Sequence, residues 1–363
     1  MPTRDRQLVL RDTIEHLGKL DLRGCQAELI VVDNASRERV IVPRKLANGM
    51  SVEVVRLEEN RGAAGRNVGV ERARGDWVVM LDDDSWLVDL GVMDVLGDVG
   101  EDVAAIGAEI FLPDGSRERG GLPEVFIGCG AAIRRDAFLN AGGYDERLGY
   151  YVEEYDLCAR LLLDGMRVAH DGRFRVRHAK STQGRNFSGI ARRLVRNNAW
   201  VMMRYAPRGE RVGHVWETIT RYGRIALNEG ASIGYARGVA ELVWSLWRQP
   251  RRPMSRELWD RFTGLAHARA SLARDTRIKP GTRAMVAHEG KHVRLIERAL
   301  VELGVVLTDP SEDPEVVVVG TLSPGPMLDA KEALHDEPRP VIVPWELPNA
   351  SEKGERESST IAA

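Results

Sequence analysis

The sequence is poor in cysteine, in long apolar runs and in net charge. Its three cysteines, Cys25, Cys129 and Cys158, have a spacing that fits neither a zinc site nor a disulfide framework. No apolar run approaches the roughly 18 residues expected of a membrane span, and no signal peptide is recognisable. The 52 basic and 54 acidic residues leave a net charge of −2, which indicates no nucleic-acid partner. These absences predict a protein of a reducing, cytoplasmic compartment.

The rest of the composition is that of a soluble globular protein, with 43% hydrophobic and 29% charged residues. Its 363 residues are enough for two or three domains. Short apolar runs alternate with helical patterns, which predicts an α/β fold with a mostly parallel sheet flanked by helices. The expected strands are 28–33, 52–57, 78–81, 103–110, 128–133 and 173–177, and a helix is expected over 153–163.

The pattern changes along the chain and divides it into segments. The predicted segments are an α/β domain over 1–210, a helical extension over 211–280, a small α/β module over 281–346 and a disordered tail over 347–363. The chain begins with a turn that leads directly into a helix. Since an α/β domain normally enters such a turn from a strand, we expect the first strand to be missing or the true start to lie upstream. The role of 283–344 stays open between acceptor recognition and oligomerisation.

The most informative segment is an apolar strand that runs into three aspartates. Residues 76–86 have the sequence Asp-Trp-Val-Val-Met-Leu-Asp-Asp-Asp-Ser-Trp. Carboxylates gathered at a strand end repel one another, and oxygen ligands suit magnesium or manganese. A hard metal at the carboxyl end of a sheet strand commonly holds the phosphates of a nucleotide. The alternative is a polar turn or a helix start, because Asp and Ser are good N-caps.

Other polar motifs surround these aspartates in a definite order. They are Asp33-Asn34-Ala35-Ser36, Asn60-Arg61-Gly62 with Ala64-Gly65-Arg66-Asn67, Gly142-Gly143-Tyr144-Asp145-Glu146, Glu153-Glu154-Tyr155-Asp156-Leu157 and Val176-Arg177-His178. In this order the motifs resemble the family-two inverting nucleotide-sugar glycosyltransferases, which have the GT-A fold. The resemblance covers residues 2–210. It implies transfer of a sugar from a nucleoside diphosphate donor, with Mn²⁺ or Mg²⁺ as the cofactor.

The resemblance assigns one set of residues to the nucleotide sugar. By their positions in the motifs these are Thr3, Arg4, Asp33, Asn34, Arg66, Asn67, Asp82 and Asp83. Asp33 is expected to hydrogen-bond the base or the ribose, which suits a carboxylate acceptor. A helix N-cap is the alternative for Asp33, and a solvated helix face is the alternative for Arg66.

A second set is implied for the metal. Asp82 and Asp84 match the family's Asp-x-Asp motif, in which the second aspartate binds the ion and the first faces the ribose or the water shell of the metal. His178 matches the histidine that often completes the site, although imidazole suits these metals less well than carboxylate does. The metal would neutralise the departing diphosphate as a Lewis acid.

The acidic segment at 153–156 is implied to hold the catalytic base. Inverting transfer needs a base that takes the proton of the acceptor hydroxyl as its oxygen attacks the anomeric carbon. Glu154 falls where the family usually has an aspartate, so the choice between Glu153 and Glu154 stays open. Asp156 is expected to orient the site or to pair with Arg160 four residues along the helix. The alternative for the whole group is a helix N-terminus decorated with acids.

Two further regions concern the acceptor. Gly128, Cys129 and Gly130 resemble the strand beside the incoming sugar, with Cys129 as a small buried side chain rather than a nucleophile. Arg185, Arg192, Arg193 and Arg196 could hold a diphosphate or an anionic lipid-linked acceptor, or form a solvated helix face. The stripe with Trp244 and Trp247, flanked by Arg248, Arg251 and Arg252, could contact an anionic membrane surface or pack as a core.

Together these expectations describe a metal-dependent inverting glycosyltransferase, a hexosyl- or deoxyhexosyltransferase using a UDP- or dTDP-type donor. Its acceptor would be a saccharide or a lipid-linked molecule in cell-envelope polysaccharide or glycoconjugate synthesis. It would act in the cytoplasm or peripherally at the inner face of the plasma membrane. The alternative is a catalytically impaired scaffold that binds a sugar nucleotide. A dinucleotide-binding oxidoreductase fits less well, because Gly128-Cys129-Gly130 lacks the third glycine and occurs too late in the chain.

Overall fold

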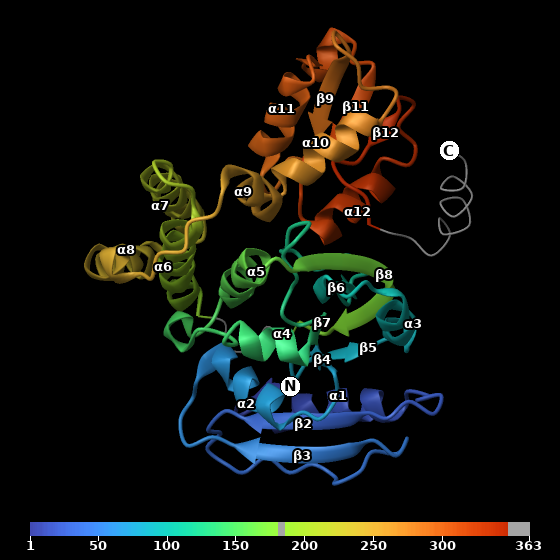
Figure 1. The fold of residues 1–363 in the computed structure, drawn as a ribbon, viewed down its shortest axis with the longest axis vertical. Coiled ribbons are helices and arrows are strands. Elements are labelled where there is room, and N and C mark those ends of the chain that lie inside the picture. The colour runs from blue at the N-terminus through green and yellow to red at the C-terminus, as the bar shows by residue number, and fades with distance from the viewer. Residues whose placement is uncertain (181–185, 348–363) are drawn as a thin grey trace.

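The computed structural model of the protein describes residues 1–180 and 186–347. Figure 1 shows an N-terminal α/β part with two sheets, a helical arm at one side and a C-terminal α/β module at the opposite end from β2 and β3. The expected α/β fold with helix-flanked sheets is confirmed. None of the helices in the two described ranges combines the length and the apolar character that a bilayer crossing requires. Arg185 and all of the predicted tail except Leu347 lie outside the described residues.

The first sheet is parallel and three-stranded, in the order β1-β2-β3. The strand that we expected to be missing is present, because Pro2–Thr3 pairs with the end of the second strand and the Met1 ammonium donates to the Ile30 carbonyl at 3.0 Å. Two residues are too few to show a strand period, which explains the wrong expectation. The elements are β1 Pro2–Thr3, α1 Gln7–Gly18, β2 Glu28–Asp33, β3 Ser51–Arg56, a 3₁₀ turn at Gly62–Ala64 and α2 Gly65–Arg72.

The second sheet is mixed and five-stranded, in the order β4-β7-β6-β8-β5. β6 and β8 are parallel, and the other neighbours are antiparallel. The pairing of β5 with β8 sets Ser85 opposite His178, which brings the aspartate run to the end of β8. The elements are β4 Trp77–Met80, β5 Ser85–Leu87, α3 Gly91–Asp98, β6 Val103–Phe111, β7 Ala131–Arg134, α4 Arg135–Asn140, a 3₁₀ turn at Glu146–Leu148, α5 Glu153–Leu163 and β8 Arg167–His178.

Two strand boundaries differ from the prediction. The strand expected over 128–133 starts at Ala131, because Gly128 to Gly130 belong to a turn in which the Gly130 amide donates to the Ile127 carbonyl at 3.1 Å. The strand expected over 173–177 extends from Arg167 to His178. A β-bulge within its pairing to β6 interrupts the apolar alternation, and this hides the first half of the strand in the sequence.

A helical arm leaves the second sheet. We use this name for α6 Phe187–Tyr205, α7 Arg211–Asn228, α8 Ser232–Ser245 and the 3₁₀ turn Leu246–Arg248. α8 approaches α6 closely, since a side chain at Gly234 or Gly238 would overlap the backbone carbonyl of Ser188 or Arg192. A small core that includes Trp200, Val215 and Leu242 joins the three helices. The predicted boundary at residue 210 therefore falls between two helices of the same bundle.

The C-terminal module contains a four-stranded parallel sheet in the order β10-β9-β11-β12. Its centre is β11, whose four valines are all buried. The elements are α9 Arg256–Thr263 and α10 Leu265–Arg274, which lead into the module, then β9 Arg283–Ala287, α11 Val293–Glu302, β10 Val306–Leu307, a 3₁₀ turn at Pro310–Glu312, β11 Val316–Val319, α12 Pro324–Ala333 and β12 Val341–Ile342.

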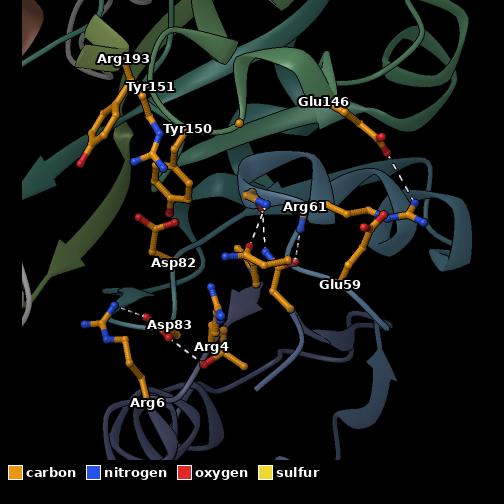
Figure 2. A pocket seen from close by; sticks show the side chains of 16 residues that line it. Arg4, Arg6, Glu59, Arg61, Asp82, Asp83, Glu146, Tyr150, Tyr151 and Arg193 are labelled. Atoms are coloured by element: carbon orange, nitrogen blue, oxygen red, sulfur yellow. Dashed lines mark hydrogen bonds and ion pairs between the residues drawn. The ribbon is translucent and has the colours of Figure 1, made fainter. Parts of the chain in front are cut away.

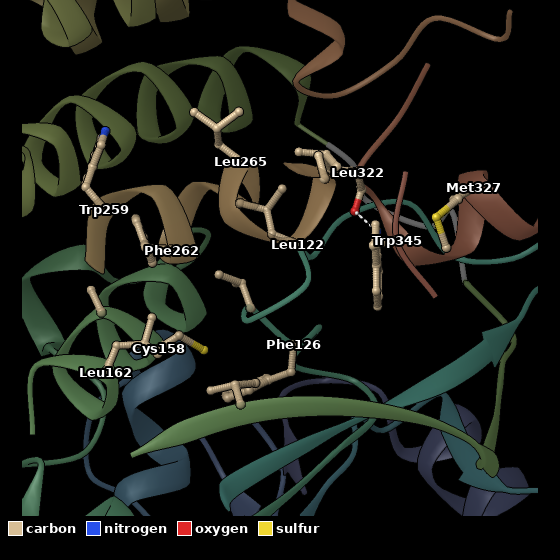
Figure 3. Packing of buried hydrophobic residues seen from close by; sticks show 14 of the residues in the cluster. Leu122, Phe126, Cys158, Leu162, Trp259, Phe262, Leu265, Leu322, Met327 and Trp345 are labelled. Carbon is tan, nitrogen blue, oxygen red and sulfur yellow. Dashed lines mark hydrogen bonds between the residues drawn. The ribbon is translucent and has the colours of Figure 1, made fainter. Parts of the chain in front are cut away.

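The module is packed onto the N-terminal part through one continuous apolar cluster, which Figure 3 shows. Leu122 and Phe126 from the β6–β7 connection contribute to it, as do Phe262 of α9 and Leu322 and Trp345 of the module. The Trp345 indole donates to the Leu322 carbonyl at 3.1 Å. Burial of this cluster stabilises the docking by the hydrophobic effect.

Candidate active site

The three consecutive aspartates form the turn between β4 and β5, and the turn is held at several points. The Asp82 amide donates to the Ser85 hydroxyl at 2.8 Å, and that hydroxyl donates to the Cys129 carbonyl at 3.0 Å. The Thr13 hydroxyl donates to the Asp83 carbonyl at 2.7 Å. The turn is therefore fixed against α1 and the β7 side of the sheet, and its carboxylates have defined directions.

Each of these carboxylates faces a cationic side chain of the protein itself. Asp82 pairs with the buried Arg66. Arg6 spans the other two, at 2.5 Å from Asp83 and 2.8 Å from Asp84. Repulsion among the acids is therefore already relieved, and it does not by itself require a metal. Arg6 was absent from the predicted set, because its contacts join residues far apart in the chain.

The environments of Asp83 and Asp84 shift their pKa values in opposite directions. Burial raises the pKa of Asp83 to about 6, against the opposing effect of Arg6 and of the Thr3 hydroxyl. Burial also acts to raise the pKa of Asp84, but the hydrogen bonds from His178 and Arg6 outweigh it and hold that pKa well below its usual range. Asp84 is therefore the more strongly ionised carboxylate of the two.

One group of side chains in the described residues has the spacing to hold a metal ion. The ligand atoms of Asp82, Cys129 and His178 lie within 4.8 Å of one another, and His178 Nε2 lies 3.3 Å from Asp84 Oδ1. Burial raises the pKa of the Cys129 thiol to about 11, so it stays protonated and is a poor ligand for a hard cation. The carboxylates fit Mn²⁺ or Mg²⁺, and the imidazole is the less suited ligand of the set.

His178 has a second partner that sequence reasoning missed. Its Nδ1 lies 2.8 Å from Glu118, which also binds Lys180 at 2.7 Å. Such a carboxylate orients a metal-binding imidazole from behind. Burial acts to lower the pKa of His178, but its contacts with Asp84, Cys129 and Glu118 raise it to about 12, so the imidazole has to release a proton before it can bind a metal. Glu118 follows β6 in an irregular loop, and no local pattern indicates its role.

A cavity of about 510 Å³ opens beside the aspartates, and Figure 2 shows its lining. Tyr150 lies above Asp82 with its hydroxyl toward that carboxylate, and the charge of Asp82 together with burial raises the pKa of Tyr150 above its ordinary range. Of the predicted donor-binding residues, the cavity is lined by Thr3, Arg4, Asn34, Asp82 and Asp83; lining residues outside that set include Arg6, Glu59, Arg61, Glu146, Tyr150, Tyr151 and Arg193.

The other three predicted donor residues do not line this cavity. The buried Asp33 accepts from the Ser36 amide at 2.8 Å and lies 3.1 Å from Arg56. Both of its carboxylate oxygens are therefore engaged by other groups of the protein. Asn67 forms a pair of 2.9 Å hydrogen bonds with the backbone of Tyr144. Arg66 reaches the site only through Asp82.

Glu153 and Glu154 follow a backbone segment in an unusual conformation. Tyr151 and Val152 have φ angles of 71° and 74°, which bulky residues rarely adopt. The buried Asn197 of α6 holds this segment by donating to the carbonyls of Leu148, Tyr150 and Tyr151 at 3.0, 3.1 and 2.8 Å. The strained segment therefore delivers both tyrosines to the cavity and both glutamates to the start of α5.

The two glutamates differ in their surroundings. Glu153 is 4% exposed, and its Oε2 has no hydrogen-bond partner. Burial and the neighbouring Glu154 raise its pKa well above the ordinary value. Glu154 is partly exposed, accepts from the Gly128 amide at 3.2 Å, and has a pKa that burial raises. Glu154 thus lies against the glycine turn that was predicted on the acceptor side.

Asp156 belongs to a buried network rather than to the cavity lining. It accepts from Arg204 and Tyr205 of α6, both at 2.7 Å, and it pairs with Arg160 at 2.8 Å. The predicted pairing with Arg160 is therefore present. The network ties α5 to α6.

The C-terminal module reaches the same region through one lysine. Lys291 donates to the Tyr155 hydroxyl, and its ammonium lies 4.3 Å from the centre of the Tyr155 ring. Burial and the charge of Arg221 lower the pKa of Lys291 to about 7, although Glu154 acts in the opposite direction. The module thus places an amine with a lowered pKa against Tyr155, the residue that follows Glu154.

Comparisons with known proteins concern the family and the fold of the chain. Residues 1–115 match the family model described as glycosyl transferase family 2. An uncharacterized glycosyltransferase of Haemophilus influenzae is 32% identical over 161 residues, which is 37% of this chain and 52% of that protein. The poly(ribitol-phosphate) beta-N-acetylglucosaminyltransferase TarS of Staphylococcus aureus is 29% identical over 90 residues, which is 24% of this chain and 16% of TarS. The chain thus spans about half the length, or less, of these curated relatives.

A solved structure shows the likeness of fold. The crystal structure of S. aureus TarS 1-349 superposes with a TM-score of 0.50 at 15% sequence identity, and covers 75% of this chain and 83% of that one. At this identity the likeness concerns the fold alone, which is of the GT-A type.

Proposed function

We propose that the chain, whose residues 1–115 match the family model of glycosyl transferase family 2, transfers a sugar from a nucleoside diphosphate sugar to an acceptor hydroxyl with inversion at the anomeric carbon. The observation that carries the proposal is the convergence of Asp82, Asp84 and His178 beside a cavity of about 510 Å³. A cavity of this size suits a small-molecule ligand.

The donor fits the cavity by its chemistry. Arg4, Arg61 and Arg193 are cationic side chains in the lining, and they suit a diphosphate. Tyr150 and Tyr151 supply aromatic faces and hydroxyls to a base or a sugar. We propose a UDP- or dTDP-type donor carrying a hexose or a deoxyhexose.

Mn²⁺ or Mg²⁺ would be held by Asp82, His178 and Asp84. When bound, the ion supplies positive charge to the diphosphate as it leaves. Arg6 and Arg66 hold the carboxylates in place from the other side, and Glu118 orients the imidazole.

Glu154 is our choice for the general base. It is more exposed than Glu153 and lies against the Gly128–Gly130 turn, where small residues leave room for an acceptor. The acceptor oxygen forms its bond to the anomeric carbon while the bond to the diphosphate breaks, and Glu154 takes the hydroxyl proton. The raised pKa of Glu154 makes it a stronger base than an ordinary carboxylate.

The acceptor would be a saccharide or a lipid-linked molecule in cell-envelope polysaccharide or glycoconjugate synthesis. Lys291 would add a hydrogen-bond donor beside it, and on this ground we propose that the C-terminal module takes part in acceptor recognition. The same proposal places the protein in the cytoplasm or at the inner face of the plasma membrane.

A thermal-shift panel of UDP, dTDP, GDP and CMP, each with and without manganese, tests the donor site. A ligand at one hundred times its dissociation constant adds about 2.7 kcal/mol of stability. We expect a shift with UDP or dTDP that requires manganese. The absence of a shift with all four nucleotides would contradict the proposal.

One observation favours a second function. Arg6 and Arg66 already neutralise the aspartates, as in a scaffold that binds a sugar nucleotide without turnover. Metal-dependent hydrolysis of the bound donor separates the two functions, because a scaffold binds the donor and leaves it intact.

A further inference from the structure

The helices α7 and α8 bury little of their surface. α7 has 18 residues, of which only Val215 and Ala226 are buried. α8 has 14 residues, of which only Gly234, Gly238 and Leu242 are buried. Ile219 and Leu246 also pack against the small core of the arm, but the Trp244 and Trp247 side chains are exposed, so the core-packing alternative for these two tryptophans is wrong.

Large apolar side chains gather on these two helices and the turn that follows. Trp216, Trp244 and Trp247 are 67%, 78% and 68% exposed, and they are the only tryptophans in the described residues that are more than half exposed. We define the arm face by the exposed residues Val212, Trp216, Leu227, Ile233, Val243, Trp244 and Trp247.

The arm face follows from helical geometry. Residues 233, 240 and 244 of α8 and residue 247 of the 3₁₀ turn that follows recur at helical spacing, on the side away from the glycines that pack against α6. On α7, residues 212, 216 and 227 share one side. The Tyr235 hydroxyl donates to the Ile219 carbonyl at 3.0 Å, and Arg211 lies 5.8 Å from the Trp247 ring centre, so the two helices lie side by side. In Figure 1 they project away from the rest of the chain.

The surroundings of the arm face are basic. Residues 208–252 contain eight arginines, four glutamates and no lysine or aspartate, a net charge of +4. Glu241 is already paired with Arg192 and Arg196, and Glu210 with Arg256, whereas Arg252 pairs with Asp164 outside this range. The surface therefore combines exposed tryptophans with excess positive charge.

We propose that the arm face binds the surface of an anionic lipid bilayer. Tryptophan combines an apolar ring with a polar N–H and suits the boundary between lipid head groups and acyl chains. Arginines around it attract anionic head groups. A second copy of the chain fits less well, because pairing two arm faces would bring together the arginines that surround each of them.

The position of the arm relates the membrane contact to the choice of acceptor. This step rests on the proposed function. Arg193 of α6 lines the cavity, and α8 packs against the neighbouring Arg192 carbonyl. A bilayer held by α7 and α8 therefore lies one helix away from the cavity. This favours a lipid-linked acceptor over a free saccharide.

Vesicle co-sedimentation tests the proposal with the full chain. Vesicles of equal parts phosphatidylglycerol and phosphatidylcholine are compared with phosphatidylcholine alone, at low and at high salt. We expect binding to the anionic vesicles that falls at least about tenfold without phosphatidylglycerol or at high salt. Equal binding to both vesicle types, or no binding to either, would overturn the proposal.

Variants locate the contact. The double variant Trp244→Ser/Trp247→Ser should bind at least about tenfold more weakly, whereas Ile41→Ser, at a residue 79% exposed and outside the arm, should bind like the wild type. Unchanged binding of the double variant would overturn the assignment to the arm face. Sedimentation velocity is run alongside, and a dimer that the double variant abolishes, without vesicle binding, would assign the face to a second copy instead. The nucleotide thermal shift of the double variant should match the wild type, which separates this test from failure of the donor site.

Discussion

At the scale of single residues, the aspartate turn shows how neighbouring carboxylates acquire different properties. Asp82 faces the cavity and Arg66, Asp83 is buried against Thr3, and Asp84 contacts Arg6 and His178. The pKa of Asp83 is raised to about 6, whereas the pKa of Asp84 is held below its usual range. Hydrogen bonds and burial, rather than residue type, make this difference.

Asp84→Asn tests the metal assignment, because it removes the negative charge and keeps the shape. We expect metal-dependent turnover to fall at least about a hundredfold, equivalent to about 2.7 kcal/mol of barrier. The manganese-dependent part of the nucleotide thermal shift should also be lost. The exposed Asp94 on α3 supplies the control Asp94→Asn, which should behave like the wild type. Near-normal turnover of Asp84→Asn would show that Asp84 does not bind the metal.

Glu154→Gln tests the base. We expect turnover to fall by about 10²- to 10⁴-fold, because the amide does not accept the proton, while donor binding in the thermal-shift panel is kept. Glu153→Gln is the matched variant, and it should lose less turnover because Glu153 is almost fully buried. The reverse order of the two losses would assign the base to Glu153.

At the scale of elements, the start of α5 depends on a side chain of α6. Asn197 is 0% exposed and satisfies three carbonyls of the segment that carries Tyr150 and Tyr151. Positive φ angles at Tyr151 and Val152 are unfavourable, so the segment needs such support. A helix of the arm therefore shapes the cavity wall.

Asn197→Leu should remove the amide donor that these three carbonyls share, at a cost of about 1–3 kcal/mol. We expect a lower melting temperature and weaker nucleotide binding, because the tyrosines lose their fixed position. Differential scanning fluorimetry with and without UDP measures both effects. The adjacent Asn198, which donates to Leu194 and Tyr222 instead, supplies the control Asn198→Ala. If both variants bound the nucleotide equally well, Asn197 would have no role in shaping the cavity.

At the scale of the whole molecule, the N-terminal part and the module share buried groups as well as apolar contacts. His170 of β8 is 3% exposed, lies 2.9 Å from the Leu122 carbonyl, and has its ring centre 5.7 Å from that of Trp345. Burial lowers the pKa of His170 from its ordinary 6.5 to about 4. His267 is shifted to about 4 for the same reason. The interface between the N-terminal part and the module therefore contains histidines that are neutral in the folded protein.

Stability should fall as the pH decreases from 6.5 to about 4. In that window the unfolded chain binds protons at His170 and the folded chain does not, so acid favours unfolding by up to about 3 kcal/mol for this residue. Urea unfolding followed by tryptophan fluorescence measures the effect.

His170→Gln should flatten this pH dependence, whereas the exposed His335 supplies a control, His335→Gln, that should leave it unchanged. An unaltered slope for His170→Gln would show that His170 does not titrate in this way.

Local patterns predicted most elements well, and long-range partners poorly. The helix expected over 153–163 has these bounds in the structure, because its apolar residues recur with helical period. The short β1 was missed, because two residues carry no period. Arg6, Glu118 and Asn197 were missed because each acts on residues at least 46 positions away.

The sequence by itself determined the α/β class and the order of the polar motifs, because strand and helix periods and motif spacing are properties of neighbouring residues. Only the tertiary structure decided which side chains face the cavity. The side chains of Asp33, at the end of β2, and Asn67, in α2, are hydrogen-bonded to the backbone of Ser36 and Tyr144, whereas Tyr150 and Arg193 line the cavity from distant parts of the chain. It also decided that Trp244 and Trp247 are exposed. The glycines of α8 pack against α6, and the two tryptophans lie on the other side of the helix.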